Sequence, residues 1–517
     1  MKSKGAVYLV GAGPGDAGLL TLRGAELLGR ADVVLYDALV NPELLRLAPP
    51  SAELIARGKN MTMPQKEITA LLAARARDGK CVVRLKGGDP YIFGRGGEEA
   101  EALAAAKIPF EVVPGVSSIA AAPNYAGIPL THREHCSSFT VFTGHSDSAD
   151  AATALRYEQI AKIPGTKVVL MGTDNLADWT KALIAQGMPA ETPVAIVQWG
   201  TTGRQKSVAG TLATIPMLAA RAAILPPALT IVGDVVRLRG KLNWFEQRPL
   251  FGRRIVVTRP RGRDAVSASQ NFRDSGTPSL PQRLAELGAE VLEIPAIRIV
   301  PTSNKQDLVE ALLELNAYDW LVFTSANGVT AFFNLFFKRF NDMRDLGGAR
   351  IAAVGPATAA KLRELHLQVD LMPEEAVGRR IAEAFAKFET VENLKMCLLR
   401  AEDAGQDLPQ ALEELGAIVD DIAVYKTVAE TDDPAGAGAD LLERGADWVT
   451  FTSSSTVEHF HARFDLPKLA KKFPQLKIAS IGPETSKAVR ALKLEPALEA
   501  KEHTTEGLIA ELLRAKL

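Results

Sequence analysis

The stretch Val83-Arg84-Leu85-Lys86-Gly87-Gly88-Asp89-Pro90-Tyr91-Ile92-Phe93-Gly94-Arg95-Gly96-Gly97-Glu98-Glu99 decides the fold of the N-terminal half of this chain. Five glycines fall within eleven residues, between an apolar run that predicts a strand (81–85) and an alanine-rich run that predicts a helix (98–106). Glycine is used where the backbone takes positive φ or approaches a ligand closely. A helix that opens after such a loop presents unpaired N–H groups. The interleaved polar and aromatic residues therefore indicate a ligand-binding loop rather than a linker.

A second glycine loop lies upstream, at Gly11-Ala12-Gly13-Pro14-Gly15-Asp16. It follows a predicted strand and precedes a predicted helix, and Asp37 closes the next strand about twenty residues on, which is the spacing of a dinucleotide-binding fingerprint. Two features argue against NAD or FAD. The third fingerprint glycine would fall at Asp16, whose carboxylate is a poor neighbour for pyrophosphate, and the loop at 87–97 has no place in that unit.

Composition narrows the class of protein. A chain of 517 residues with 47% hydrophobic content is expected to form two to four domains. Its net charge of −1 argues against a general nucleic-acid binder. The three cysteines, Cys81, Cys136 and Cys397, are too far apart for a disulfide framework or a thiolate zinc site. Because we see neither a signal-peptide core nor a bilayer-length apolar run, we expect a cytoplasmic protein without membrane contact.

Strand-like and helical runs alternate along the whole chain, which predicts an α/β protein. The alternation breaks near 242–252, where Asn243-Trp244-Phe245-Glu246-Gln247-Arg248-Pro249-Leu250 intervenes before a new strand at 254–258. We place a domain boundary there, which separates residues 1–245 from residues 252–517. The short linker suggests that the halves lie close together. A polar segment at 262–279 is predicted to be a surface loop.

The second half contains an internal repeat. The matched segments are 280–289 with 408–417, 319–325 with 447–453, and 353–358 with 480–485. A repeat of this length indicates a duplicated α/β domain rather than a solenoid. Each copy places Thr-Ser at the end of one strand and Gly-Pro-x-Thr at the end of another, where open α/β sheets bind ligands. Two such edges facing each other would frame a cleft.

The first half resembles the S-adenosylmethionine-dependent uroporphyrinogen-III C-methyltransferases. Besides the two glycine loops, the resemblance over residues 5–245 is carried by the segments 21–24, 112–118, 127–133, 142–145 and 226–233. It implies two α/β subdomains with the cofactor between them, and a homodimer. It also implies transfer of methyl groups from S-adenosylmethionine to C2 and C7 of uroporphyrinogen III, which gives precorrin-2.

The resemblance also implies roles for individual residues. The cofactor contacts fall on Pro14, Gly87, Gly88, Asp89, Ile92, Ser117, Ser118, Met171 and Gly200. The proton acceptor falls on Asp37 and the proton donor on Lys59. Relatives often carry Thr-Ala where this chain has Ser117-Ser118. Three alternatives stay open: Asp37 caps the segment after its strand, Lys59 is a solvated loop charge, and Met171 fills the core.

The chemical requirements of methyl transfer agree with the roles implied for the cofactor-binding residues and for Asp37. Methyl transfer to an electron-rich pyrrole carbon mainly requires that the reacting atoms are held in line, and a carboxylate such as Asp37 can then accept the proton that leaves. Arg133 is a candidate partner for a substrate carboxylate, or a surface charge. His132 and His135 form H-x-x-H, but we count no carboxylate or cysteine cluster with them and predict no metal.

The second half, residues 252–517, resembles uroporphyrinogen-III synthase. The motifs are 254–260, 323–329, 354–358, 424–427, 451–454 and 481–485. The resemblance implies two similar α/β lobes joined by a two-stranded connector, one lobe being discontinuous. The implied reaction removes the terminal hydroxyl of hydroxymethylbilane, inverts the last pyrrole ring and closes the macrocycle. Tyr425 is the position implied to help the hydroxyl leave.

The substrate supplies most of the reactivity, so this half needs many hydrogen-bond donors rather than a strong base. The candidate substrate-binding residues are Thr258, Ser325, Thr358, Ser453 and Thr485. Two alternatives stay open: these residues cap helices, and Tyr425 is a connector residue whose hydroxyl is satisfied by backbone.

The combined hypothesis is a bifunctional tetrapyrrole enzyme in which synthase precedes methyltransferase. One alternative is a methyltransferase of a later corrin intermediate. Another is a second half that acts as a two-lobed ligand sensor without turnover. The sequence leaves open whether the product feeds sirohaem or cobalamin.

Overall fold

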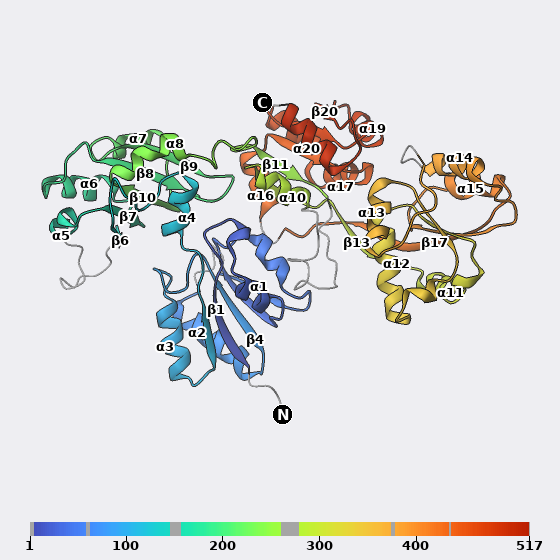
Figure 1. Cartoon of the computed structure of the whole chain (residues 1–517), viewed down its shortest axis with the longest axis horizontal. Coiled ribbons are helices and arrows are strands. Elements are labelled where there is room, and N and C mark those ends of the chain that lie inside the picture. The colour runs from blue at the N-terminus through green and yellow to red at the C-terminus, as the bar shows by residue number, and fades with distance from the viewer. Residues whose placement is uncertain are drawn as a thin grey trace. The chain divides into compact units, whose positions relative to one another are not determined.

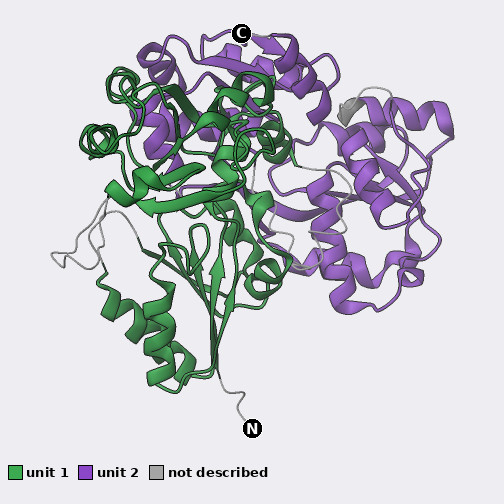
Figure 2. Cartoon of the chain, turned by 60° about the vertical axis from the view of Figure 1, so that its left-hand side comes forward, with its two compact units in different colours: residues 1–255, 264–291 green, residues 256–263, 292–517 purple. Residues whose placement is uncertain are grey.

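The computed structural model describes residues 5–57, 63–144, 157–259, 279–373, 378–433 and 436–515. It forms two compact units, Met1–Ile255 with Asp264–Val291, and Val256–Arg263 with Leu292–Leu517 (Figure 2). The main division therefore falls a few residues after the segment 242–252. The predicted loop at 262–279 and Lys59 lie outside the described residues, apart from Ser279. Among the helices that are described, none is long and apolar enough to cross a membrane.

The first unit begins with a parallel five-stranded sheet in the order β3-β2-β4-β1-β5 (Figure 1). Its strands are β1 (Ala6–Gly11), β2 (Val33–Asp37), β3 (Glu53–Arg57), β4 (Cys81–Lys86) and β5 (Phe110–Val113). Its helices are α1 (Leu22–Leu28), α2 (Gln65–Arg77) and α3 (Gly96–Ala105), with 3-10 segments η1 (Ala17–Leu19) and η2 (Pro42–Leu47). One apolar cluster joins the sheet to α2 and α3, and another joins it to α1 and η2. Because both faces are covered, the central strands are apolar runs.

A second, mixed sheet in the same unit has the order β6-β7-β10-β8-β9. Its strands are β6 (Phe139–Thr143), β7 (Thr166–Leu170), β8 (Pro193–Gln198), β9 (Lys206–Thr211) and β10 (Ala228–Val232). Its helices are α4 (Ser118–Tyr125), α5 (Tyr157–Lys162), α6 (Leu176–Ala185), α7 (Ile215–Arg221) and α8 (Arg239–Leu242), with η3 (Asp234–Leu238). Strand β10 is antiparallel to both of its neighbours, and β8 and β9 form a hairpin. The two-subdomain α/β architecture predicted for the first half is confirmed.

The duplicated lobes of the second half have matching sheets, β12-β11-β18-β19-β20 and β13-β17-β16-β14-β15. The strands of the former are β11 (Arg254–Val257), β12 (Glu290–Glu293), β18 (Trp448–Phe451), β19 (Lys477–Ser480) and β20 (Leu498–Glu499). The strands of the latter are β13 (Ile297–Pro301), β14 (Trp320–Phe323), β15 (Arg350–Ala353), β16 (Lys395–Ala401) and β17 (Ile418–Ala429). Strands β14 and β15 repeat the parallel pairing of β18 and β19. The first of these sheets takes its strands from both ends of the half, from 254–293 and from 448–499.

Helices cover these two sheets. They are α10 (Leu280–Glu286), α11 (Lys305–Leu313), α12 (Ala326–Arg339), α13 (Pro356–Glu364), α14 (Gly378–Phe388), α15 (Asp407–Glu414), α16 (Ala437–Arg444), α17 (Ser454–Phe464), α18 (Leu466–Lys472), α19 (Pro483–Ala491) and α20 (Thr505–Arg514). The predicted connector is the antiparallel pair of β13 and β17, which runs from Ile297 opposite Ala429 to Pro301 opposite Tyr425. Strand β17 is 12 residues long, so it serves both as a sheet strand and as a connector strand.

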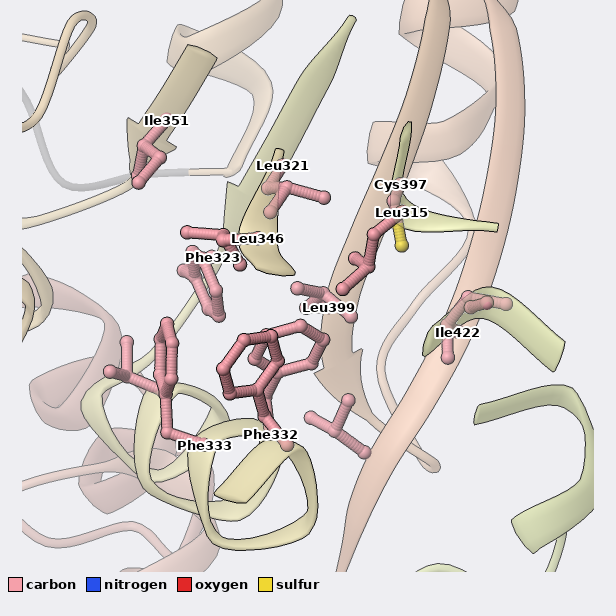
Figure 3. Close-up of a cluster of buried hydrophobic side chains, with 14 of the residues drawn as sticks. Leu315, Leu321, Phe323, Phe332, Phe333, Leu346, Ile351, Cys397, Leu399 and Ile422 are labelled. Carbon is pink, nitrogen blue, oxygen red and sulfur yellow. The ribbon is translucent and has the colours of Figure 1, made fainter. Parts of the chain in front are cut away.

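Aromatic packing forms the core of the lobe that contains β14. Phe323 from β14 meets Phe332 and Phe333 from α12, with ring centroids 5.6 and 6.0 Å apart (Figure 3). All three side chains are buried, and burying one such ring contributes roughly 1.5–3 kcal/mol. This packing holds the N-terminus of α12, where Ser325 lies, against the end of β14.

Candidate functional site

The two glycine loops of the first half lie against each other. The Gly88 N–H donates to the Gly13 carbonyl at 2.8 Å, and the Gly13 N–H donates to the Gly88 carbonyl at 3.3 Å. Next to them, the Ala12 N–H donates to the Lys86 carbonyl at 2.7 Å. The loops after β1 and β4, which sequence reasoning treated as separate motifs, thus form one backbone cradle at the carboxyl edge of the sheet.

Glycine is required in this cradle by close approach of backbones. A Cβ on Gly115 would lie 2.1 Å from the Gly88 carbonyl oxygen and 2.7 Å from the Gly11 Cα. Gly88 itself has φ +65, which side chains rarely adopt. Beside Gly87, in contrast, the nearest atom to an added Cβ is the Leu39 Cβ, at 3.9 Å. The cradle is tight on the side of β5 and roomy beside Gly87.

Asp89 fastens this cradle to β5. Its Oδ2 accepts from the Gly115 N–H at 3.0 Å, and its Oδ1 accepts from the Tyr91 N–H at 2.8 Å. The carboxylate therefore orients the loop with both oxygens. Ile92, three residues after Asp89, is 41% exposed. A direct cofactor contact by Asp89 or Ile92 stays a prediction.

The other predicted cofactor residues belong to the adjoining elements. Ser117 caps α4 by accepting from the Ile119 N–H at 3.3 Å, and its Cα lies 3.9 Å from a Cβ built on Gly88. Gly200 packs on α4, where an added Cβ would lie 2.5 Å from the Ala122 Cβ. Ser118 is the first residue of α4. Pro14 lies in the loop after β1, and the structure brings that loop together with Gly88 and Ser117.

Met171 follows β7 in the second sheet. Its backbone has φ +49 and its side chain is 54% exposed. Since more than half of the side chain is accessible, the alternative that Met171 fills the core is not supported. A role in cofactor contact stays a prediction.

The predicted proton acceptor, Asp37, ends β2 at the same edge. Arg84 donates to its Oδ1 at 2.6 Å, and Arg57 lies 3.7 Å from the same oxygen. The following segment, η2, is capped by Asn41, whose Oδ1 accepts from the Glu43 N–H. The alternative in which Asp37 caps that segment is therefore wrong: its side chain forms ion pairs and is 25% exposed.

A buried cluster of charged side chains lies beside Asp37 and includes its ion-pair partner Arg84. This cluster was not predicted from the sequence. The Glu99 Oε1 accepts from Arg84, Lys86 and Gln65 at 3.3, 3.1 and 2.8 Å. Both cations and Glu99 are buried. Burial, followed by the neighbouring Arg84 charge, lowers the pKa of Lys86. The available signal was the alternation of Arg84 and Lys86 on one face of an otherwise apolar strand.

Arg133 lies on an exposed turn closed by two backbone bonds between His132 and Cys136, at 3.0 and 2.8 Å. Contrary to the sequence analysis, a carboxylate does accompany the H-x-x-H motif. Among the described residues, Glu134 brings one carboxylate oxygen within 4.8 Å of a ring nitrogen of His132 and of His135. However, the His132 Nδ1 already accepts from the Glu134 N–H at 3.2 Å. This bond favours a proton on Nε2, the nitrogen that would otherwise be free to bind a metal.

In the second half, Tyr425 and Ser325 form a hydroxyl pair. Their oxygens are 3.1 Å apart, and the Ser325 Oγ also accepts from the Gly328 N–H at 3.0 Å, which caps α12. The Tyr425 side chain is buried, and this burial raises the pKa of its phenol. The hydroxyl of this connector residue is thus matched by a side chain, not by backbone as the structural alternative supposed.

The remaining predicted substrate residues differ in accessibility. Ser453 caps α17 by accepting from the Thr456 N–H at 3.3 Å, so the capping alternative holds for both serines. Thr258 is fully buried and donates to the Thr450 carbonyl at 2.7 Å. Thr358 and Thr485 are buried within the first turns of α13 and α19. The N-caps of α13 and α19 are Gly355 and Gly482, so neither Thr358 nor Thr485 is an N-cap, and in this conformation all three threonines are buried.

Comparison with known proteins matches each half separately and the chain as a whole. Residues 6–216 match the family model of tetrapyrrole (corrin/porphyrin) methylases, and residues 279–510 match that of uroporphyrinogen-III synthase HemD. The porphyrin biosynthesis protein HemD of Ruminiclostridium josui is 39% identical over 513 residues, which cover 98% of each protein.

Two further relatives match the first half alone. The S-adenosyl-L-methionine-dependent uroporphyrinogen III methyltransferase of Methanosarcina barkeri is 50% identical over 247 residues, 47% of this chain and 96% of that protein. Among solved structures, uroporphyrin-III C-methyltransferase of Thermus thermophilus complexed with S-adenyl homocysteine is 42% identical. It covers 45% of this chain and 100% of that chain, with a TM-score of 0.39.

Proposed function

This chain belongs to the tetrapyrrole methylases over residues 6–216 and to the uroporphyrinogen-III synthases over residues 279–510, and we propose that its two activities are consecutive. The second half converts hydroxymethylbilane to uroporphyrinogen III with inversion of ring D. The first half then methylates that product at C2 and C7, using two molecules of S-adenosylmethionine, to give precorrin-2. The observation that carries the proposal is the presence in one chain of the glycine cradle and the Ser325–Tyr425 pair.

The cradle suits a compact sulfonium cofactor. Room beside Gly87, the backbone of Gly88 and the small residues at 117 and 118 permit close contact with a ligand. Pro14 and Gly200 border the cradle from the loops after β1 and β8, and Met171 would contribute from the end of β7. When bound, the cofactor supplies an electrophilic methyl group. The chain's task is then to hold the substrate carbon in line with it.

Acid–base catalysis is proposed to take place at the carboxyl edge of the first sheet, beside the cradle. Within the described part of the chain, both arginine contacts of Asp37 go to Oδ1, which leaves Oδ2 to accept the proton from the methylated ring. Lys59 is proposed as the proton donor. Arg133, on its exposed turn, is proposed to pair with a substrate carboxylate. We propose that the active form is a homodimer through the methyltransferase half and that neither active site uses a metal.

In the second half, we propose that Tyr425 assists departure of the substrate hydroxyl by donating its phenolic hydrogen. Its raised pKa keeps it protonated at neutral pH. Ser325 and Ser453, at the N-termini of α12 and α17, are proposed as substrate hydrogen-bonding groups. Thr258, Thr358 and Thr485 can take this role only if their enclosing contacts open.

A coupled assay tests the whole proposal. Purified full-length protein is given hydroxymethylbilane with and without S-adenosylmethionine, and products are separated by chromatography. We expect uroporphyrinogen III alone without the cofactor, and a dimethylated product with two equivalents of S-adenosylhomocysteine when it is present. Absence of turnover on hydroxymethylbilane favours the two-lobed sensor. Methylation of later precorrins but not of uroporphyrinogen III favours the corrin methyltransferase.

Tyr425→Phe tests the synthase site. Loss of one hydrogen bond, worth about 0.5–1.5 kcal/mol, is expected to slow enzymatic ring closure up to about tenfold. The uncatalysed route is unaffected, so the share of uroporphyrinogen I rises. The isomer ratio after oxidation measures this. Tyr318→Phe is the matched control, since it removes another buried hydroxyl, bonded to Asp420 at 2.7 Å, in the same lobe. If Tyr425→Phe keeps the wild-type isomer ratio and the wild-type rate of ring closure, catalysis rests on the other hydrogen-bond donors and not on Tyr425.

A further inference from the structure

The first glycine loop is anchored to the second sheet of its unit through Asp16. The Asp16 Oδ2 accepts from the Tyr125 hydroxyl at 2.7 Å, and its Oδ1 accepts from the Gly18 N–H at 2.8 Å, which caps η1. Its own N–H donates to the Thr201 Oγ1 at 3.1 Å. Tyr125 ends α4, and Thr201 lies in the turn between β8 and β9. One residue in a loop of the first sheet is therefore held by two elements of the second.

These contacts close into a ring. The Thr201 N–H donates to the Gln205 Oε1 at 3.0 Å, and the Gln205 Nε2 donates to the Tyr125 carbonyl at 3.3 Å. The loop is also packed tightly against this turn, because a Cβ on Gly15 would lie 2.5 Å from the Thr202 Cγ2. Thr201 is 2% exposed. A closed, partly buried ring of hydrogen bonds resists a shift of either loop more than one bond does.

The segment predicted to be an interdomain linker supports the same tyrosine. The rings of Trp244 and Phe245 lie 5.0 and 4.8 Å from the Tyr125 ring, and Phe245 is 2% exposed. Glu246 accepts from Gln205 at 2.9 Å, which adds it to the ring of contacts. Burial, together with the Asp16 carboxylate, raises the pKa of Tyr125, so the phenol stays a donor at neutral pH. The start of this segment is therefore packed into the first unit.

The position of this ring relates it to the cofactor cradle. Pro14 is two residues before Asp16, and Gly200 immediately precedes Thr201; both are proposed cofactor contacts, one from each sheet. The ring is what ties these two loops together. We propose that Tyr125 is a positioning residue for S-adenosylmethionine: its hydrogen bond to Asp16 sets the spacing of the loops at Pro14 and Gly200. This inference rests on the proposed methyltransferase function.

A double-mutant cycle on ligand affinity tests the inference. Full-length wild type, Tyr125→Phe, Asp16→Asn and the double variant are titrated with S-adenosylhomocysteine by calorimetry. Tyr125→Phe removes the donor of this bond and Asp16→Asn removes the charge of its acceptor, so each single variant is expected to bind about tenfold more weakly. The double variant should bind no more weakly than the weaker single one, since both changes act on the same bond. Tyr157→Phe, on α5 of the same unit, is the control and should bind like wild type.

A second pair of variants keeps the test decisive if Tyr125→Phe perturbs folding. Thr201→Val removes the oxygen that accepts from the Asp16 N–H and should weaken binding, whereas Thr201→Ser keeps it and should restore affinity. Wild-type affinity in both Tyr125→Phe and Thr201→Val overturns the inference, as does an additive double-mutant cycle. If the wild-type chain itself fails to bind S-adenosylhomocysteine, the proposed cofactor site fails and the positioning role falls with it.

Discussion

Gly88→Val is expected to abolish binding of S-adenosylmethionine while ring closure by the second half proceeds at the wild-type rate. Gly88 has φ +65, where a β-branched residue is strained by about 1–3 kcal/mol. Its N–H and carbonyl both pair with Gly13, so relief of that strain would separate the two glycine loops. If the backbone stays in place, the valine methyl groups instead enter the space beside Ser117. Either response removes the cradle, and we expect at least about a 100-fold loss of affinity.

The measurement is calorimetric titration with S-adenosylhomocysteine, alongside a rate assay on hydroxymethylbilane. Gly97→Val is the matched control, because Gly97 lies in the same glycine-rich segment but has nothing within 4 Å of an added Cβ. It should bind like wild type. Normal affinity in Gly88→Val would show that the ligand does not meet this backbone.

Asp37→Asn is expected to lower the methylation rate by about 10²-fold or more, the usual effect of removing a general base. Affinity for the cofactor should change little, since within the described residues the Asp37 side chain pairs with Arg84 and Arg57 and not with the cradle loops. The asparagine keeps the shape of the aspartate, and Arg84 keeps its buried partner Glu99, so the local fold should persist. Initial rates at saturating cofactor, together with a binding titration, measure the two effects separately.

Asp32→Asn provides the control on the opposite end of the same strand. Asp32 accepts from the Cys81 N–H at 2.7 Å and lies just before β2, at the amino edge of the sheet. Its removal should leave methylation unchanged, because catalytic groups of such sheets lie at the carboxyl edge. An unchanged rate in Asp37→Asn would instead assign Asp37 to charge balance with Arg84 and Arg57.

Local patterns were sufficient for many of the elements and for the repeat in the second half, and the resemblance to the two families implied the architecture. The predicted strand at 81–85 and helix at 98–106 correspond to β4, Cys81–Lys86, and α3, Gly96–Ala105. The repeat in the second half was visible because both copies kept the same order of strand, Ser cap and helix, and the structure shows Ser325 and Ser453 as those caps. Hydrophobic periodicity, glycine positions and helix caps depend on residues that are close together in the sequence. They can therefore be predicted before the fold is known.

Contacts between residues far apart in the sequence could not be predicted from these local patterns. Capping stayed an open alternative for Asp37 until the structure paired its side chain with Arg84, 47 positions later. The Tyr425 hydroxyl is hydrogen-bonded to Ser325, 100 residues away in the sequence. The Tyr125 hydroxyl is hydrogen-bonded to Asp16, 109 residues away. The linker reading of 243–250 missed the packing of Trp244 and Phe245 against Tyr125 for the same reason.

By itself, then, the sequence determined that this chain is a duplicated α/β synthase joined to a two-subdomain methylase, and where its two glycine loops lie. Only the tertiary structure decided that those loops pair through Gly13 and Gly88, that Glu99 balances Arg84 and Lys86, and that Asp16 is held from the second sheet. The physical reason is that strand and helix preferences are local. The partner of a buried polar group, in contrast, is whichever group the packed sheets bring within hydrogen-bonding distance.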